Sequence, residues 1–213
     1  MTENSIYGRF AGVLPEVLKE FSERLEDWNR QQMEKTGHSV WNHLVCRVKE
    51  ENSMREKCRR RGLPETPESA LLELNDSIGI RVVTRFVDDI YRVADHLREM
   101  EGVSIREEKD YIRAGKPNGY RSYHMILEIE HPEEDIRGNR PGRYRAEIQL
   151  RTIAMDTWAS LEHEMYYKKK VKNQSLIASE LKRCADELAS CDLTLKTIRD
   201  LIREESPEEE EQE

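Results

Sequence analysis

The 213-residue sequence has few cysteines and no long apolar run, and both shortages narrow the classes of protein that it can encode. Its four cysteines, Cys46, Cys58, Cys184 and Cys191, form no CxxC pair and follow no Cys/His ligand spacing, which argues against a zinc site and against a disulfide framework. No segment comes near the roughly 18 to 20 consecutive apolar residues that a membrane-spanning helix needs, and residues 1–10 contain no apolar run typical of a signal peptide. We therefore expect a soluble, cytoplasmic protein with reduced thiols and no membrane partner.

An excess of acidic charge is also largely absent once the C-terminal end is set aside. The whole chain has 35 Lys and Arg against 43 Asp and Glu, a formal charge of −8, but seven of those acids lie in residues 204–213, which leaves 35 against 36 in residues 1–203. Basic charge gathers between Arg47 and Arg61, where seven Lys and Arg accompany three Glu. A local positive patch on a neutral body suits a small polyanion such as a nucleotide, whereas RNA binding favours a wider basic surface and is not indicated.

Apolar spacing predicts helices at both ends of the chain. Pro15–Lys35 carries apolar residues at helical spacing between charged ones, and Gly37 follows as a helix end. Toward the C-terminus a helix is predicted from Thr152 to Lys169, and a second along apolar residues that alternate steps of four and three from Ile177 to Ile202. That heptad seam is typical of a helix packing lengthwise on another helix, and it leaves open whether the partner lies in the same domain or in another subunit.

The middle of the chain carries strand patterns around one helix, Asp88–Met100. Strands are predicted at Ile78–Phe86, Val103–Ile112, Tyr123–Ile129 and Arg143–Arg151. In the last of these, apolar residues at positions 144, 146, 148 and 150 alternate with charged and amide residues. Because successive side chains of a strand point to opposite faces, one face of this strand is available for polar contacts.

Two carboxylates occupy positions that neighbouring strands can bring together. Glu147 projects from the polar face of its strand, and Asp76 precedes a strand predicted to be buried. Converging carboxylates beside phosphates form a magnesium site, because Mg²⁺ prefers about six hard oxygen ligands and takes only one or two from protein. The alternative is that Asp76 caps a turn and that Glu147 pairs with Arg145 or Arg121 across strands.

The basic cluster between positions 47 and 61 offers groups that suit a triphosphate. Arg47, Lys49, Lys57 and Arg60, with Ser53 among them, can satisfy phosphate oxygens from several directions. The alternative is a solvated helix face, which is the commoner fate of such charge runs.

The turn at Lys116–His124 concentrates groups that can stack on a purine or donate hydrogen bonds to it. Glycine lets the backbone approach a ligand, and Tyr120 can lie flat against a base. The alternative is that Tyr120 packs within a hairpin and that His124 is a strand histidine whose hydrogen bonds are satisfied inside the fold.

Together these segments resemble a known family, the small alarmone synthetases, which are synthetase-only relatives of the Rel/SpoT enzymes that make ppGpp and pppGpp. The resemblance covers about Leu14–Lys170, and the matching strings occur in the family's order. They are Arg47-Val-Lys49 with Ser53, Lys57 and Arg60; Asp76-Ser-Ile-Gly-Ile-Arg81; Lys116 to His124 with its Gly-Tyr-Arg-Ser-Tyr-His; Glu147-Ile-Gln-Leu-Arg-Thr152; and Trp158-Ala-Ser-Leu-Glu-His163.

The resemblance implies an α+β fold, with a mixed sheet of about five strands flanked by helices, similar to nucleotidyltransferases, and with N- and C-terminal helices for oligomerisation. It implies transfer of the β,γ-pyrophosphate of ATP to the 3′-hydroxyl of GTP or GDP, with release of AMP, by a Mg²⁺-dependent homotetramer. The His-Asp pair of the family's hydrolase domain has no counterpart here, so we expect synthesis without hydrolysis. The competing hypotheses are an inactive oligomeric nucleotide- or RNA-binding module of the same fold, and a nucleotidyltransferase that releases pyrophosphate.

The resemblance also assigns roles to single residues by motif match. Asp76 and Glu147 would hold Mg²⁺, and Glu147, helped by Gln149, would accept the proton of the 3′-hydroxyl. The ATP-binding residues would be Arg47 and Arg81, on the two faces of adenine, with Lys49, Ser53, Lys57, Arg60 and Glu162. The residues that bind GTP or GDP would be Lys116, Tyr120, His124, Gln149 and Asp156.

One of these positions departs from the family pattern. Asp156 stands where many members have Asn, and the change removes an amide donor, which leaves that acceptor-nucleotide contact open. We expect a helical segment over residues 1–36, a catalytic domain over 37–170, the heptad helix over 171–203 and a disordered acidic tail over 204–213.

Overall fold

The computed structural model describes residues 5–166 and 173–205. Its centre is a five-stranded mixed sheet in the order β1-β2-β5-β4-β3. The strands are β1 (Trp41–Val48), β2 (Ile78–Thr84), β3 (Val103–Asp110), β4 (Tyr123–His131) and β5 (Gly142–Thr152). β5 runs parallel to β2, and every other pair is antiparallel. The expected α+β class with a mixed sheet of about five strands is confirmed.

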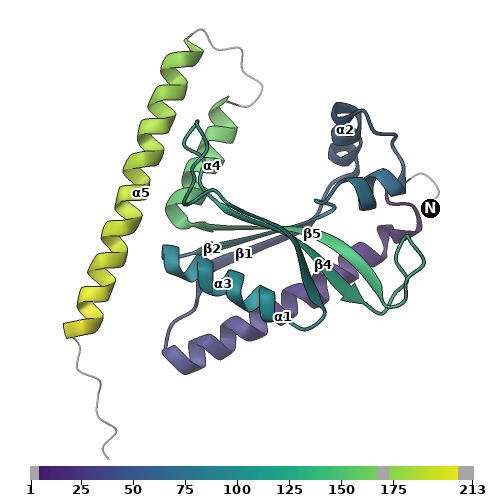
Figure 1. Ribbon diagram of the computed structural model, residues 1–213, viewed down its shortest axis with the longest axis horizontal. Helices are drawn as coiled ribbons and strands as arrows, with labels where there is room; N and C mark the ends of the chain where they lie inside the picture. Colours follow the sequence, from purple (N-terminus) through teal and green to yellow (C-terminus); the bar gives the residue numbers. More distant parts are fainter. Residues whose placement is uncertain (1–4, 167–172, 206–213) are drawn as a thin grey trace, which may run out of the picture.

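Helices flank this sheet on both sides (Figure 1). α1 (Val13–Thr36) and α3 (Val87–Glu99) cover one face, while α2 (Glu51–Arg61) and α4 (Ile153–Tyr166) rise from the other side near its two ends. α5 (Gln174–Glu205) stands beside the sheet and contacts α4 and α3. Within residues 5–166 and 173–205, no helix combines the length and apolar character needed to cross a membrane.

Local sequence explains which face of α1 is buried and where the helix ends. Its apolar side chains on one stripe are buried, and Phe21 and Leu25 have no exposed area. Gly37 ends the helix with a φ of 71° and donates its backbone N–H to the Met33 carbonyl, in the left-handed conformation that glycine adopts without steric cost. The helix predicted over Pro15–Lys35 is therefore confirmed.

The central strand β5 shows the predicted alternation, but two arginines on its polar face are buried as well. Ala146, Ile148 and Leu150 point into the core and have no exposed area. On the polar face, however, Arg145 and Arg151 are 8% and 5% exposed. These two arginines stay buried because each finds oxygen acceptors inside the fold.

The C-terminal region divides the predicted heptad seam into two parts. Leu181 and Leu188 pack against the cluster around Trp158 of α4, whereas Leu195 and Ile198 are 52% and 46% exposed. The first half of the seam thus packs within its own domain, and the second half meets no comparable cover in the part of the chain that the structure describes.

Several predicted boundaries shift by a few residues. α5 runs through Glu205, so the first two residues of the expected acidic tail are helical, and residues 206–213 lie outside the described chain. The predicted helix end at Lys169 also lies outside it, since the description of α4 stops at Tyr166. β1 is an addition: no strand was predicted over Trp41–Val48.

Candidate active site

A polar cleft of about 280 Å³ opens on the face of the sheet opposite α1 and α3. Strand register creates it: Arg47, Gly79 and Glu147 form one row across β1, β2 and β5, and Arg81 and Gln149 lie in the next row. The predicted site residues that line the cleft are Arg47, Lys49, Asp76, Arg81, Glu147 and Gln149. The structure therefore brings together residues that are as far as a hundred positions apart in the chain.

Asp76 lies two residues before β2, and one of its carboxylate oxygens forms ion pairs with two lysines. Its Oδ2 is 2.8 Å from Nζ of Lys49 and 2.6 Å from Nζ of Lys57. Burial alone would raise the pKa of Asp76, but the hydrogen bonds from the two lysines lower it below its ordinary value. Asp76 is therefore ionised at neutral pH, as a metal ligand must be.

Glu147 pairs with a histidine rather than with an arginine. A hydrogen bond of 3.2 Å joins Oε1 of Glu147 to Nδ1 of His124, and Nε2 of His124 is 2.7 Å from Oη of Tyr120. The bond with His124 lowers the pKa of Glu147, against the opposing effects of burial and of the charge on Asp76. The alternative pairing of Glu147 with Arg145 or Arg121 is not what the structure shows.

The donor set fits a magnesium ion. Oδ1 of Asp76 is buried and has no hydrogen-bond partner among the described residues, so this oxygen is available to a cation. Within those same residues no group of three or more His, Cys, Asp and Glu side chains is arranged for a metal. Two carboxylates in one cleft match Mg²⁺, which takes one or two protein ligands and fills its other positions with phosphate oxygens and water.

Arg151 connects the two sides of the site, and sequence reasoning did not single it out. Its Nη2 donates to Oη of Tyr120 at 2.8 Å and to Oε1 of Gln149 at 2.9 Å, and its Nη1 donates to Oδ1 of Asp156 at 2.9 Å. The same Asp156 oxygen lies 3.4 Å from Nη1 of Arg81. The sequence feature that could have identified Arg151 is its place on the polar face of β5, within Glu147-Ile-Gln-Leu-Arg-Thr152.

The ring of Tyr120 is half-buried in an aromatic and cationic cluster. The ammonium of Lys116 lies 4.9 Å from the ring centroid, and the guanidinium of Arg151 lies 5.3 Å from it. Edge-to-face contacts join the ring to Trp158 and to His124. The alternative that Tyr120 and His124 find partners inside the fold is therefore true of this structure, and Lys116, which is exposed, is the group that can leave the ring open to a base.

The remaining predicted ATP-binding residues, Ser53, Lys57, Arg60 and Glu162, are not among those that line the cleft. Ser53, Lys57 and Arg60 recur at steps of four and three on α2, and so share one face of that helix. Ser53 is half-buried and Arg60 is exposed. Glu162 is half-buried on α4 and is not among the residues that line the cleft, so its contact with ATP stays a prediction.

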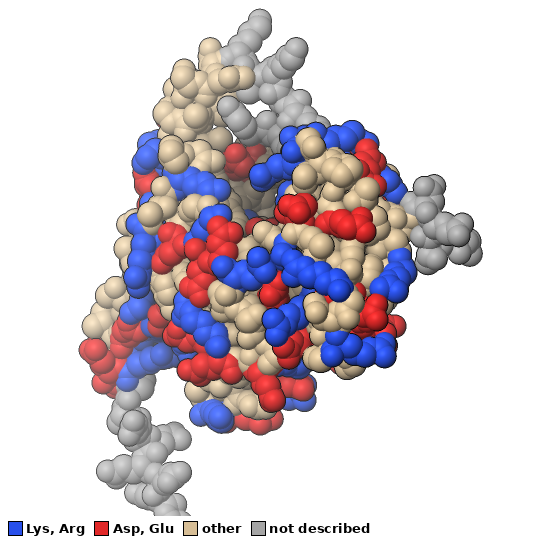
Figure 2. All heavy atoms as spheres, turned by 45° about the vertical axis from the view of Figure 1, so that its right-hand side comes forward, with Lys and Arg blue, Asp and Glu red and all other residues tan. Residues whose placement is uncertain are grey.

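Charge outside the cleft is mixed. In Figure 2, lysine and arginine side chains are interspersed with aspartate and glutamate over the face shown, without a wide basic area. This distribution agrees with a small polyanionic ligand rather than with a long nucleic acid.

Comparison with known proteins finds a family model and relatives that match most of this chain. Residues 46–172, more than half of the chain, match the family model described as the region found in RelA / SpoT proteins. GTP pyrophosphokinase YwaC of Bacillus subtilis (strain 168) is 41% identical over 150 residues, which cover 70% of each chain.

Solved structures share the whole architecture. Small alarmone synthetase 1 of Bacillus subtilis, bound to its product pppGpp, superimposes with a TM-score of 0.76 at 29% identity, covering 92% of this chain and 97% of that one. The structure of the same synthetase bound to AMPCPP gives a TM-score of 0.73 at 26% identity, with the same coverage.

Proposed function

The chain belongs to the RelA/SpoT family, in the group of small alarmone synthetases, and from that premise we propose that it is a GTP pyrophosphokinase that moves the β,γ-pyrophosphate of ATP to the 3′-hydroxyl of GTP or GDP. The observation that carries the proposal is a single cleft lined by two ionised carboxylates: Asp76 contacts Lys49 and Lys57, and Glu147 contacts His124, which is in turn hydrogen-bonded to Tyr120.

The reaction needs one bond to form and one to break. The 3′-oxygen of the acceptor attacks the β-phosphorus of ATP, and its proton passes to the carboxylate of Glu147. The bond between the β-phosphorus and the α,β-bridging oxygen breaks, and AMP leaves with that oxygen. Glu147 can accept the proton because it is ionised, and His124 fixes one of its two oxygens; since its lowered pKa makes it a weaker base, the transfer depends on this positioning.

Asp76 and Glu147 would hold Mg²⁺, which when bound neutralises charge on the phosphates. The lysines that now pair with Asp76 are placed to reach the same phosphates, because Lys49 lies in the short connection between β1 and α2 and Lys57 lies on α2. Ser53 shares the face of α2 with Lys57 and extends this phosphate-binding surface.

The two bases bind on opposite sides of the carboxylates in this proposal. Arg47 and Arg81 project from adjacent rows of the same sheet face, and their planar guanidinium groups can hold adenine between them. On the other side, guanine stacks on Tyr120 once Lys116 moves off the ring, and the freed ammonium can then reach the acceptor's phosphates. Stacking on Tyr120 is compatible with its hydrogen bond to Arg151, which lies at the hydroxyl end of the ring.

A product assay tests the proposal. The protein is incubated with Mg²⁺, ATP and either GTP or GDP, and the nucleotides are separated by anion exchange. We expect AMP and a guanosine nucleotide with two additional phosphates in equal amounts. Glu147→Gln should make neither, whereas Glu130→Gln, an exposed glutamate of β4 outside the cleft, should behave as the wild type.

Two other results would contradict it. Release of pyrophosphate in place of AMP would indicate nucleotidyl transfer, and binding of both nucleotides without any product would indicate an inactive binding module. Incubation of the protein with purified pppGpp in Mg²⁺ or Mn²⁺ should leave that nucleotide intact, because no hydrolase His-Asp pair is present in the sequence.

A further inference from the structure

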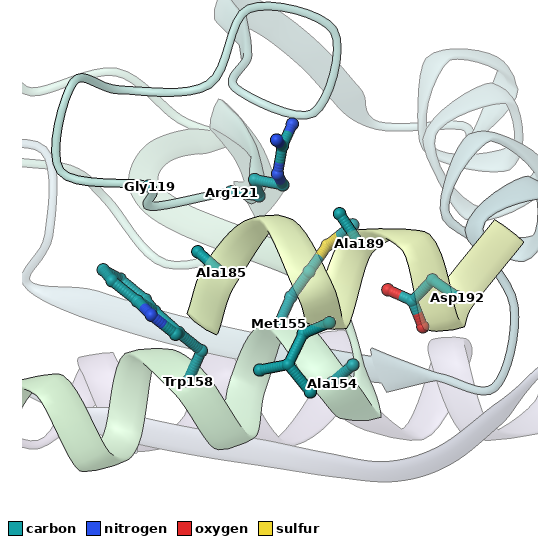
Figure 3. A pocket seen from close by; sticks show the side chains of 9 residues that line it. Gly119, Arg121, Ala154, Met155, Trp158, Ala185, Ala189 and Asp192 are labelled. Atoms are coloured by element: carbon teal, nitrogen blue, oxygen red, sulfur yellow. The ribbon is translucent and has the colours of Figure 1, made fainter. Parts of the chain in front are cut away.

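The long helix α5 contacts the loop that carries Tyr120, here called the acceptor loop (residues 116–122). Figure 3 shows α5 lying between α4 and the part of this loop that carries Gly119 and Arg121. The interface is closely packed, since the space left in it is about 10 Å³, which is room for about one water molecule.

Gly119 lets the loop backbone lie directly on the helix. A Cβ at this position would stand 2.6 Å from Cβ of Ala185 and 3.1 Å from Cα of Lys182, and the φ of 94° is itself unfavourable for other residues. A hydrogen bond reinforces this contact, in which Nη2 of Arg121 donates to Oδ1 of Asp186 at 3.0 Å, and α5 is also held to α4 because Nε1 of Trp158 donates to the Leu181 carbonyl at 2.8 Å.

A second contact lies at the junction of β5 and α4. Oγ1 of Thr152 donates to Oδ2 of Asp192 at 2.6 Å and accepts the backbone N–H of Met155, which caps α4. Thr152 directly follows Arg151, the residue that binds Tyr120, Gln149 and Asp156. Asp192 therefore connects α5 to the strand end from which Arg151 projects.

The direct contacts of α5 with the acceptor loop lie on the acceptor side of the active site, and α5 reaches the ATP-side residue Arg81 only indirectly, through Thr152, Arg151 and Asp156. Among the described residues, no hydrogen bond or ion pair joins α5 to the ATP-side residues Arg47, Lys49 or Asp76. The docking is also shallow, because Ala185 and Asp192 are the buried residues of α5 in the described chain. A small change at the Gly119 contact can therefore move the acceptor loop with less effect on the ATP side, where α5 has no direct contact with Arg47, Lys49 or Asp76 among the described residues.

We propose that α5 is a positioning element for the acceptor nucleotide: Ala185, Asp186 and Asp192 set the acceptor loop and the β5–α4 junction in the geometry that binds GTP or GDP. This inference rests on the proposed function. It makes α5 a determinant of acceptor affinity although none of its residues need touch the nucleotide.

Kinetic constants for the two substrates test the proposal. Ala185→Leu places a larger side chain against the Gly119 backbone and should raise the KM for GDP by about tenfold, with the KM for ATP unchanged within about twofold. Asp186→Ala, at an exposed position, should give a smaller change in the same direction. Ser190→Leu, an exposed position on the same helix, is the matched control and should change neither constant.

Substitutions of Asp192 test the role of α5 a second time, through its hydrogen bond with Thr152. Asp192→Ala should weaken GDP binding, whereas Asp192→Asn keeps an oxygen acceptor for the Thr152 hydroxyl and should restore it. Circular dichroism and thermal unfolding of each variant show whether the fold is retained. If the variants at the buried positions Ala185 and Asp192 unfold, the GDP and ATP constants of Asp186→Ala still test the proposal.

The result that would overturn the proposal is an equal change in both KM values, or no change in either, for Ala185→Leu and Asp186→Ala. Calorimetric titration of GDP alone and ATP alone into each variant gives the same comparison without catalysis. A wild type that makes no alarmone would contradict the proposed function, and these titrations would still decide whether α5 controls the acceptor side.

Discussion

Asp156 holds two arginines of the site together. Its Oδ1 lies 2.9 Å from Nη1 of Arg151 and 3.4 Å from Nη1 of Arg81. Burial lowers the pKa of Arg81, and the charge of Arg151 lowers it further, while Asp156 opposes both effects. The carboxylate that departs from the family's Asn thus balances two neighbouring positive charges.

We predict that Asp156→Asn lowers the free energy of unfolding by about 1–3 kcal/mol, because it removes one partner of a largely buried charged cluster. Urea unfolding of the nucleotide-free protein measures this. Asp27→Asn breaks the exposed pair between Asp27 and Arg30 and should change stability by less than about 0.5 kcal/mol. Equal effects of the two substitutions would contradict the role given to Asp156.

Asp192 gives a pH dependence of predictable sign. Burial raises its pKa above the ordinary value of 3.8, and the hydrogen bond from Thr152 opposes that shift only in part. Its contribution to stability is therefore fully present below pH 3.8 and is lost as the pH rises through the native pKa.

We predict that Asp192→Asn unfolds at a higher temperature than the wild type at pH 7.5, by about 2–4 °C if about 1 kcal/mol is gained. The gain should shrink as the pH is lowered toward 4. Asp186→Asn is the control of opposite sign, because hydrogen bonds from Lys182 and Arg121 lower the pKa of Asp186. A gain for Asp192→Asn that does not depend on pH would contradict this account.

The residues of the site were predictable to different degrees. Alternation along β5 placed Glu147 and Gln149 on a polar face, and the structure has them there. Spacing could not tell that Glu147 would pair with His124, since that contact depends on the register between β4 and β5. The burial of Arg151 depends on acceptors from three separate segments, and a sequence pattern does not report such convergence.

At the scale of elements, the N-terminal segment before α1 supports the ATP side. Tyr7 is 2% exposed, and its hydroxyl donates to the Lys49 carbonyl at 2.6 Å, while Oγ of Ser5 donates to Oε1 of Glu51 at the start of α2. The segment thus ties the β1–α2 connection, which presents Lys49 to the cleft, to the rest of the fold.

We predict that Tyr7→Phe lowers stability by about 0.5–1.5 kcal/mol and raises the KM for ATP more than the KM for GDP. The physical reason is that Lys49 loses a constraint on its own backbone. Tyr91→Phe is the matched control: it removes a hydroxyl that donates to Asp110 at 3.1 Å, away from α2. Equal changes in the ATP constant for both variants would refute the specific role of Tyr7.

Most elements were predictable, including the edge strand β3, which was expected over Val103–Ile112 and runs over Val103–Asp110, but the edge strand β1 was not. Helices α1 and α3 and strands β2, β4 and β5 lie within a few residues of their expected places, because each buries a regular stripe or face. β1 was missed because it is an edge strand whose outward residues include Asn42 and His43, so that its burial pattern shows no clean alternation. The depth at which Ala185 packs was also unpredictable, since it lies beside the heptad seam and not on it.

For the whole molecule we propose a homotetramer that uses the exposed half of the α5 seam. Leu195 and Ile198 are 52% and 46% exposed, and this apolar surface favours association. Light scattering should give a mass of about four 25.2-kDa chains. The double substitution Leu195→Glu and Ile198→Glu should reduce that mass. Leu193 is 60% exposed but lies off the seam, so Leu193→Glu should leave the mass unchanged. A monomeric wild type would contradict the proposal.

The strand order carries a consequence for how the molecule is made. β5 is inserted between β2 and β4, so that Ile78 of β2 pairs with Ala146 and Ile126 of β4 pairs with Glu147. The β1–β2 pair and the β3–β4 pair precede β5 in the chain; the first pair carries part of the cleft lining, and the second carries His124, which contacts Glu147. Long-range parallel pairing is slow to form. A nascent chain that has not yet emerged through residue 152 therefore lacks the strand that joins the two pairs, and the cleft, which includes Glu147 and Gln149, cannot be complete before that strand is added.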